Sequence, residues 1–276
     1  MTGSLSVVMP VYNTAPALLE RSVGSLTAQT YKDLEIILVD DGSREETAEK
    51  LDRLAVGDPR IRVIHQENRG VSAARNAGIR AASGRFLTMM DADDSIARKA
   101  FETVIRKLLR TGADACVFGW QSISVDGHRR AFQVLRGQRA ALETPERILP
   151  TVLIADQLRG GGYPWNKVWD LYQTGSPELF DEDLYSYEDK LWCVRMYQKC
   201  RAVLLLPETF YTYYQAEISL SRAERSGAGA AAAKRKNALT AYDRIMTALP
   251  RRSAACAAAG LFRYKTIIMG ILKGTG

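Results

Sequence analysis

The sequence predicts an α/β fold with a mostly parallel central sheet flanked by helices. Short apolar, β-rich runs alternate with stretches of helical periodicity over the first 120 residues, which is the pattern of strand–helix–strand units. Acidic residues directly follow two of these runs, as expected at the carboxyl edge of an open sheet. The chain has 276 residues, of which 46% are hydrophobic and 25% charged, so its composition is that of a globular protein.

The expected elements follow in order along the chain. Apolar, β-rich runs predict strands over residues 5–11, 34–39, 61–65, 85–90 and 115–120. Apolar residues at helical spacing predict helices over residues 16–27, 43–54, 71–82 and 97–110. Ser43 and Glu46 have the spacing of a capping box, so we expect Ser43 to cap the second helix. After residue 120 we expect a hairpin over 122–134, helices over 143–154 and 188–199, an extended segment over 203–214, and Ala-rich helices over 234–249 and 253–272.

Charge and cysteine content narrow the class of protein. The net charge is +7, which suits anionic ligands or an anionic lipid surface. Lys and Arg form no dense block with interleaved aromatic residues, so we expect no nucleic-acid partner. The four cysteines match no zinc spacing, and a reduced, cytoplasmic setting fits them. We see neither a signal peptide nor an uncharged apolar run long enough to span a bilayer.

Three carboxylates crowd into the turn after the strand expected over residues 85–90. Asp91, Asp93 and Asp94 follow Met90 almost without a break. Clustered carboxylates repel one another unless a cation or hydrogen bonds compensate, and a hard ion such as Mg²⁺ or Mn²⁺ holding a diphosphate would do so. The alternative is a helix cap, because Asp94 or Ser95 could start the next helix.

Two further groups of side chains follow the first two expected strands. Tyr12 comes just after Pro10, which we expect to end the first strand. Its ring could stack on a nucleobase, or it could only pack on a helix. Asp40 and Asp41 end the second strand, where a carboxylate could accept a hydrogen bond from a base or a ribose. Either acid could instead serve only the turn.

Two helix starts complete the candidate site. Small residues surround Arg75 in the helix expected over residues 71–82, where a close approach to a phosphate is feasible. Arg75 could reach a diphosphate, or it could be a surface arginine. Glu188 and Asp189 open the helix expected over 188–199. One of them could act as a general base, or both could only favour the positive end of the helix dipole.

The order of these motifs resembles that of the family 2 glycosyltransferases, which have the nucleotide-diphospho-sugar transferase fold called GT-A. The resemblance covers the first 110 residues and rests on residues 6–13, 36–43, 68–78 and 91–94. Weaker similarity extends through Trp165-Asn166-Lys167, residues 187–189 and 211–221. It implies a GT-A domain over 1–225, with a nucleotide-binding half (1–120) and an acceptor half (121–225), followed by a C-terminal helical extension (226–276).

The resemblance also implies roles for matching residues. Asp93, with Asp91, would hold Mn²⁺ or Mg²⁺. The nucleotide-sugar would contact Asp91 and Ala92, and Arg75 would help to neutralise its diphosphate. For the nucleoside, the expected contacts are Pro10, Tyr12, Asp40 and Asp41, and Asp189 is the expected catalytic base. The sequence departs from several relatives at Gln215, where they place a cationic side chain near the diphosphate. Neutralisation of the diphosphate would therefore depend on the metal, Arg75 and Arg222.

The implied reaction is inverting transfer of a sugar from a nucleotide-diphospho-sugar, with UDP as the expected nucleotide, to an acceptor hydroxyl in glycan or polysaccharide synthesis. The acceptor would be a saccharide or a lipid-linked saccharide. Cations and apolar residues mix over 257–273, so we expect weak peripheral association with the inner face of a membrane in preference to insertion. The alternative is that this helix only packs on the protein core. Two alternatives remain: a nucleotidyltransferase, disfavoured because no Gly-rich loop follows the first strand, and a non-catalytic nucleotide-sugar-binding protein. A dinucleotide-dependent oxidoreductase fits poorly, because no G-x-G-x-x-G motif follows a strand.

Overall fold

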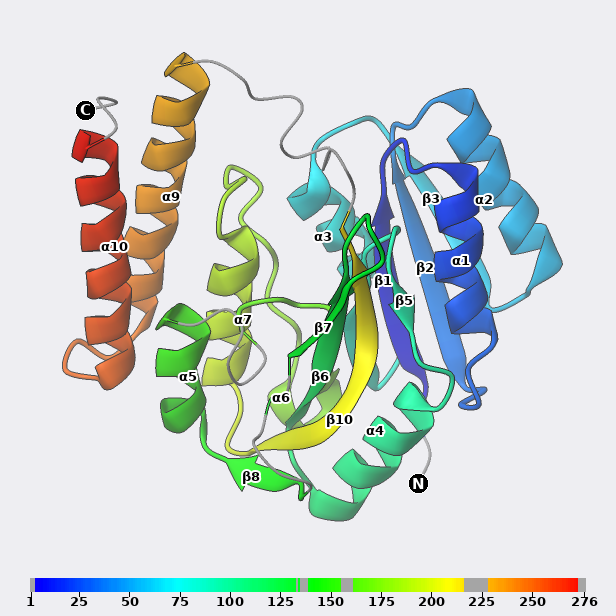
Figure 1. Ribbon diagram of the computed structural model, residues 1–276. Coiled ribbons are helices and arrows are strands. Elements are labelled where there is room, and N and C mark those ends of the chain that lie inside the picture. The colour runs from blue at the N-terminus through cyan, green and yellow to red at the C-terminus, as the bar shows by residue number, and fades with distance from the viewer. Residues whose placement is uncertain (1–2, 133, 135–138, 155–160, 216–227, 273–276) are drawn as a thin grey trace.

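A central sheet with helices against both faces forms the molecule (Figure 1). The computed structural model describes residues 3–132, 134, 139–154, 161–215 and 228–272. The strands are β1 (Leu5–Val11), β2 (Leu34–Asp41), β3 (Ile61–Gln66), β4 (Phe86–Met89), β5 (Ser95–Ile96), β6 (Ala115–Ile123), β7 (Arg129–Phe132), β8 (Ala141–Glu143), β9 (Lys167–Asp170) and β10 (Val203–Tyr214). The helices are α1 (Pro16–Thr27), α2 (Glu45–Gly57), α3 (Val71–Ala81), α4 (Ala100–Thr111), α5 (Pro145–Ile154), α6 (Leu171–Thr174), α7 (Glu188–Gln198), α9 (Ala228–Ala248) and α10 (Ala254–Leu272).

The sheet is parallel in its first half and mixed in its second. Its strand order is β3-β2-β1-β4-β9-β6-β10-β5, with β7 and β8 paired to β6 and β10. The pairs among β3, β2, β1 and β4 are all parallel. Strand β9 then runs antiparallel to both of its neighbours, β4 and β6. The α/β class with a mostly parallel sheet and flanking helices is therefore confirmed. Strand β9 interrupts the parallel order, because it runs opposite to β4 and β6, which share one direction with β10.

Apolar side chains on both faces of the strands explain why helices cover the sheet on both sides. Along β1, Val7 and Met9 join an apolar cluster with side chains of α1 and α4, whereas Val8 joins a second cluster with side chains of α3 and α7. Helix α3 lies so close to β1 that a Cβ atom on Gly78 would overlap the Val8 side chain. The small residues of α3 thus permit close packing on the sheet.

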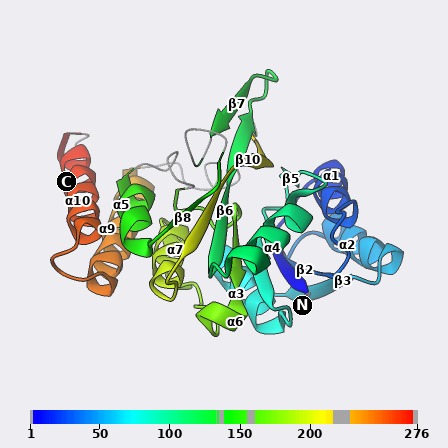
Figure 2. The same cartoon turned by 90° about the horizontal axis from the view of Figure 1, so that it is seen from below.

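The C-terminal extension is a hairpin of two helices, as expected, at the end of the molecule far from β3 (Figures 1 and 2). Tyr242 and Ile245 of α9 and Ala258 of α10 are buried in the same apolar cluster as the side chains of α5 and α7. The domain division remains a prediction: the boundary after residue 225 lies outside the described residues, and the boundary after residue 120 falls within β6. No helix in the described part of the chain combines the length and apolarity needed to cross a bilayer.

Several local expectations about element ends are wrong. The predicted range of the first strand, 5–11, is confirmed, but Pro10 does not end its pairing, because Val11 still lies opposite Asp40 of β2. Helix α2 has Arg44 at its N-cap with no side-chain cap bond, because the Ser43 hydroxyl instead accepts from the Asn13 backbone N–H at 3.0 Å. Helix α4 begins at Ala100, so neither Asp94 nor Ser95 caps it, and Ser95 belongs to β5.

Candidate active site

The parallel pairing of β1, β2 and β4 brings three of the predicted motifs to one edge of the sheet. Val11 lies opposite Asp40, and Val8 lies opposite Met89, two residues before Asp91. Tyr12, Asp40 and Asp91 therefore all lie at the carboxyl ends of neighbouring strands. This is the edge at which open α/β sheets bind ligands.

The two acids at the end of β2 have different surroundings. The buried Asp40 accepts a hydrogen bond from the Ser43 backbone N–H through Oδ1 (2.9 Å), and its Oδ2 lies 2.8 Å from Nδ1 of His65. The bond with Asp40 raises the pKa of His65 above its usual value. Asp41 instead accepts from the side chain of Gln66 and from the backbone N–H groups of Arg69 and Gly70, at 2.7–2.9 Å. It thereby holds the segment that leads into α3, and any contact with a nucleotide stays a prediction.

The acidic turn after β4 divides its carboxylates between two environments. Asp91 is 30% exposed, and Asp93 is half-buried. Burial, followed by the charge of Asp91, raises the pKa of Asp93. Asp94 is buried, and it accepts bonds from the Tyr211 hydroxyl (2.7 Å) and the Tyr214 backbone N–H (3.0 Å). Asp94 therefore anchors the turn, and Asp91 and Asp93 are the pair left for a ligand.

The side chain of Ala92 does not reach the edge of the sheet. It is 6% exposed and lies in the apolar cluster on the α1 face. A contact between Ala92 and a donor would thus involve its backbone. Pro10 lies in β1 opposite Val39 and is partly buried, as is Tyr12 just beyond the strand.

Two residues that the sequence reasoning missed fix the acidic turn. The Tyr211 hydroxyl, which donates to Asp94, also accepts from the Asp91 backbone N–H at 3.2 Å. Arg21 of α1 donates to the Asp93 carbonyl at 2.5 Å, and its guanidinium stacks 3.5 Å from the centre of the Tyr214 ring. Both residues act through tertiary contacts, so no local spacing marks them, although Tyr211 lies in a segment with weak family similarity.

Arg75 joins the acidic turn to the helix that carries the predicted base. Its guanidinium lies 3.3 Å from Asp91 Oδ1 and 3.6 Å from Glu188 Oε1. The residue is 6% exposed, so it is not a surface arginine. Burial would lower the pKa of Arg75, but the neighbouring carboxylates outweigh it and raise the pKa. Residues about 100 positions apart in the chain thus meet around one buried cation.

Asp189 lies in the first turn of α7 with a pKa suited to proton transfer. Burial, followed by the charge of Glu188, raises the pKa of Asp189 to about 7, although Arg75 acts in the opposite direction. Asp189 Oδ1 accepts from the Lys190 backbone N–H at 2.7 Å. The preceding Tyr187 has φ of +61°, a left-handed conformation that non-glycine residues adopt mainly where surrounding structure enforces it.

The Trp165-Asn166-Lys167 segment is buried and interacts with residues of this site. Lys167 is fully buried at the start of β9 and donates to the Tyr163 carbonyl (2.5 Å) and to Asn166 Oδ1 (2.7 Å). Burial lowers the pKa of Lys167 to about 8, and the charge of Asp189 opposes this shift. The Trp165 ring stacks on Tyr211 with centres 4.3 Å apart, which supports the tyrosine that fixes the acidic turn.

A family model described as glycosyl transferase family 2 matches residues 6–155, more than half of the chain. The chain belongs to glycosyltransferase family 2. This match includes Tyr12, Asp40, Arg75 and the acidic turn, whereas Asp189 lies outside the matched residues.

Relatives in the family extend the similarity into the second half of the chain. EpsJ of Bacillus subtilis (strain 168), an uncharacterized glycosyltransferase, is 32% identical over 223 residues, which are 80% of this chain and 64% of EpsJ. The glycosyltransferase GlyG of Streptococcus pneumoniae serotype 4 (strain ATCC BAA-334 / TIGR4) is 30% identical over 81% of this chain and 75% of GlyG. The chain thus spans less than two thirds of the length of EpsJ, and it spans 75% of the length of GlyG.

Solved structures of S. aureus TarS share the fold. Residues 1–349 of S. aureus TarS, crystallised with UDP-GlcNAc, superpose with a TM-score of 0.69 over 98% of this chain and 92% of that one. The complex of the same protein with UDP gives a TM-score of 0.66. The sequence identities are 17% and 18%, so this likeness establishes the GT-A fold alone.

Proposed function

We propose that this family 2 glycosyltransferase moves a sugar from a nucleotide-diphospho-sugar, with UDP as the nucleotide, to an acceptor hydroxyl with inversion of the anomeric carbon. One observation carries the proposal: Arg75 contacts both Asp91 and Glu188. The acids expected to hold the donor and the helix expected to supply the base therefore meet in one site, as a direct transfer requires.

The donor's nucleoside would lie at the edge formed by β1 and β2. Tyr12 would stack on the base, with Pro10 beside it, and Asp40 would accept from the base imide N–H. The neighbouring His65 and Ser43 bond to separate oxygens of Asp40, which orients the carboxylate before a ligand arrives. In S. aureus TarS, crystal structures contain UDP and UDP-GlcNAc, and these ligands support a UDP-sugar as the donor class here.

The acidic turn fits a divalent cation shared with a diphosphate. In the described part of the chain, no three His, Cys, Asp or Glu side chains gather as a complete metal site. Mg²⁺ and Mn²⁺ commonly bind through one or two carboxylates, with substrate phosphates and water supplying the other ligands. Asp93 and Asp91 would hold such an ion, and their mutual repulsion supports this fit. A bound ion would stabilise negative charge on the departing diphosphate.

Asp189 would take the proton from the acceptor hydroxyl as its oxygen bonds to the anomeric carbon. The bond between that carbon and the diphosphate oxygen breaks on the opposite face, and the diphosphate leaves with the electron pair. A pKa of about 7 suits a base that must be ionised at neutral pH and still accept a proton. Arg75 would place positive charge between the base helix and the diphosphate.

The acceptor proposed is a saccharide or a lipid-linked saccharide, in glycan or polysaccharide synthesis. Chondroitin synthase of Pasteurella multocida (strain Pm70) is 33% identical over 114 residues, which supports a saccharide as the acceptor class.

We place the protein in the cytoplasm, where its four free cysteines would stay reduced. Leu261, Tyr264 and Lys265 are exposed on α10, and they would give weak, salt-sensitive contact with an anionic membrane.

Release of UDP tests the reaction. We expect the protein to release UDP from at least one UDP-sugar in the presence of Mn²⁺ and saccharide acceptors. Loss of this release in EDTA would support metal dependence. A protein that binds UDP but turns over no donor would instead be a non-catalytic binding protein.

Flotation with anionic and neutral vesicles at low and high salt tests the proposed membrane contact of α10.

A further inference from the structure

The chain that enters α7 needs external support, because its last residue before the helix has a left-handed backbone. Tyr187 has φ of +61° and no side-chain cap bond at the helix start. A conformation of this kind persists only where neighbouring structure enforces it. The position of Asp189, two residues later, depends on that support.

Asn237 of α9 supplies three hydrogen bonds to this segment. Its Oδ1 accepts from the backbone N–H groups of Tyr185 (2.9 Å) and Ser186 (3.0 Å). Its Nδ2 donates to the Asp183 carbonyl at 3.0 Å. One side chain of the C-terminal hairpin thus binds three of the four residues that precede Tyr187.

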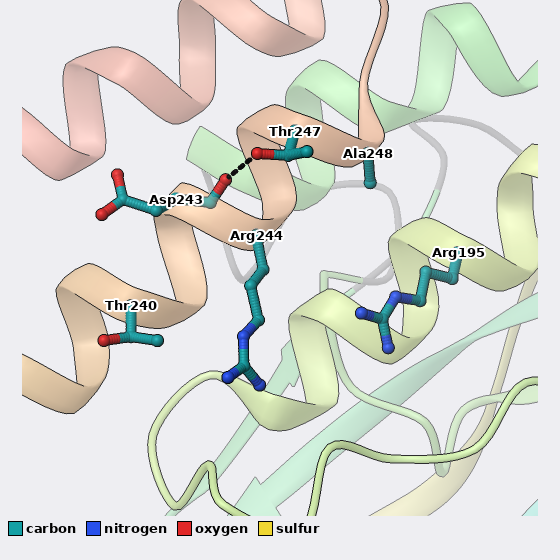
Figure 3. A pocket seen from close by; sticks show the side chains of 6 residues that line it. All are labelled: Arg195, Thr240, Asp243, Arg244, Thr247 and Ala248. Carbon is teal, nitrogen blue, oxygen red and sulfur yellow. Dashed lines mark hydrogen bonds between the residues drawn. The ribbon is translucent and has the colours of Figure 1, made fainter.

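Ion pairs join the same elements beside Asn237. Arg244 of α9 contacts both oxygens of Asp183 (2.7 and 2.6 Å) and Oδ2 of Asp181 (2.6 Å). Arg195 of α7 reaches the other oxygen of Asp181 at 2.5 Å. Figure 3 shows Arg244 extending from α9 and Arg195 from α7 with their guanidinium ends turned toward each other, where they line a pocket of about 450 Å³. Asp181 already binds both arginines, and Asp183 binds Arg244. The pocket is therefore part of the interface between α7 and α9.

Ring packing extends the contact to the left-handed residue itself. The Tyr187 ring lies 5.0 Å from the ring of Tyr242, five residues beyond Asn237 in α9. Tyr242 is buried. Helix α9 therefore contacts the entry to α7 from residue 183 to residue 187.

We propose that Asn237 is a positioning residue for the transfer reaction: it holds residues 183–186 so that α7 presents Asp189 to the acceptor hydroxyl. This inference rests on the proposed role of Asp189 as the base. It gives the C-terminal hairpin a function in catalysis beyond covering the sheet. Because Asn237 contacts no predicted donor residue, its loss should affect turnover and spare nucleotide binding.

Three variants test the proposal. Asn237→Ala removes all three bonds, and Asn237→Asp keeps the oxygen that accepts two of them. Arg263→Ala is the matched control, because it removes an ion pair with Asp243 within the same hairpin without touching residues 183–187. We would measure UDP release from UDP-GlcNAc or another accepted UDP-sugar, UDP affinity with Mn²⁺ by calorimetry, and hydrogen exchange at the Tyr185 and Ser186 amides.

We expect Asn237→Ala to lower kcat by about tenfold or more, since small displacements of reacting groups have effects of this size. Its UDP affinity should stay within about twofold of wild type, and the two amides should exchange faster. Asn237→Asp should have a higher kcat than Asn237→Ala, and Arg263→Ala should match wild type. A normal kcat in Asn237→Ala, or an equal loss in Arg263→Ala, would overturn the proposal. An inactive wild-type protein would instead refute the proposed function.

Discussion

Arg75 and Glu188 form an ion pair, at 3.6 Å, between the first helix after β3 and the helix that carries Asp189. Arg75 contacts Asp91 through its other terminal nitrogen. The pair therefore couples the acids expected to hold the donor to the proposed base. The buried Arg75 cation, which contacts Asp91 and Glu188 and also attracts Asp189, offsets part of the repulsion among these carboxylates before any substrate binds.

Metal-dependent binding of UDP is the first prediction. UDP should raise the melting temperature more with Mn²⁺ than with EDTA, because a ligand that binds only the folded state stabilises it in proportion to its occupancy. Asp93→Ala should abolish the metal-dependent part of the shift. Asp126→Ala, which changes an exposed acid in the β6–β7 turn, should leave it intact. Equal shifts with Mn²⁺ and EDTA would exclude a metal shared with the diphosphate.

Stacking on the nucleobase is the second prediction. Tyr12→Ala should weaken UDP binding by about fivefold to 150-fold, the effect of losing about 1–3 kcal/mol of stacking. Calorimetric titration measures this directly. Tyr172→Ala is the control, because Tyr172 is 80% exposed in α6 and away from the edge of the sheet. An unchanged affinity in the Tyr12 variant would assign that ring to packing alone.

Removal of the Tyr211 hydroxyl should loosen the acidic turn. Tyr211→Phe leaves the buried Asp94 and the Asp91 N–H without the group that they share. The free energy of unfolding should fall by about 1–3 kcal/mol, the usual effect of an unsatisfied buried polar group. Urea denaturation measures the change. The Mn²⁺-dependent part of the UDP shift should fall as well, and full retention of both quantities would show that the turn needs no such support.

The pKa of Asp189 predicts a dependence of stability on pH. Its folded pKa of about 7 exceeds the usual unfolded value of about 3.9. Between these values the folded state holds a proton on Asp189 that the unfolded state has lost, so the contribution of Asp189 to stability falls as pH rises from about 4 to 7. Asp189→Asn lacks this titration. Its stability relative to wild type should increase over that interval and then level off, and a constant difference would show an ordinary pKa.

Much of the nucleotide half could be predicted from the sequence, because local signals determine it. Helix α1 begins and ends at the expected residues, Pro16 and Thr27, since a proline at its start and one apolar stripe define it. The acceptor half was less predictable. The Trp165-Asn166-Lys167 motif gave no sign that Lys167 begins a strand antiparallel to β4 and β6, because strand direction depends on pairing between distant segments.

The candidate site also contains some residues that the sequence predicted and others that it did not. Asp91, Arg75 and Asp189 were expected from motif order, and the structure brings them to one place. Arg21 and Asn237 were not expected, because each acts by bonding to backbone atoms of a segment more than 50 residues away. A single sequence carries no signal for such contacts. Small residues in α3 were interpreted as room for a phosphate, whereas Gly78 provides room for Val8 of β1.

Turnover by Asp189→Asn is the most direct test of the central claim that Asp189 is the base of a sugar transfer at this site. The substitution keeps the side-chain shape and the oxygen that accepts from the Lys190 N–H, but it removes basicity. The variant should release UDP from the donor at roughly one hundredth of the wild-type kcat or less, while its affinity for UDP with Mn²⁺ stays close to wild type. Near-normal turnover, with affinity also unchanged, would contradict the account and leave Asp189 a structural residue of α7.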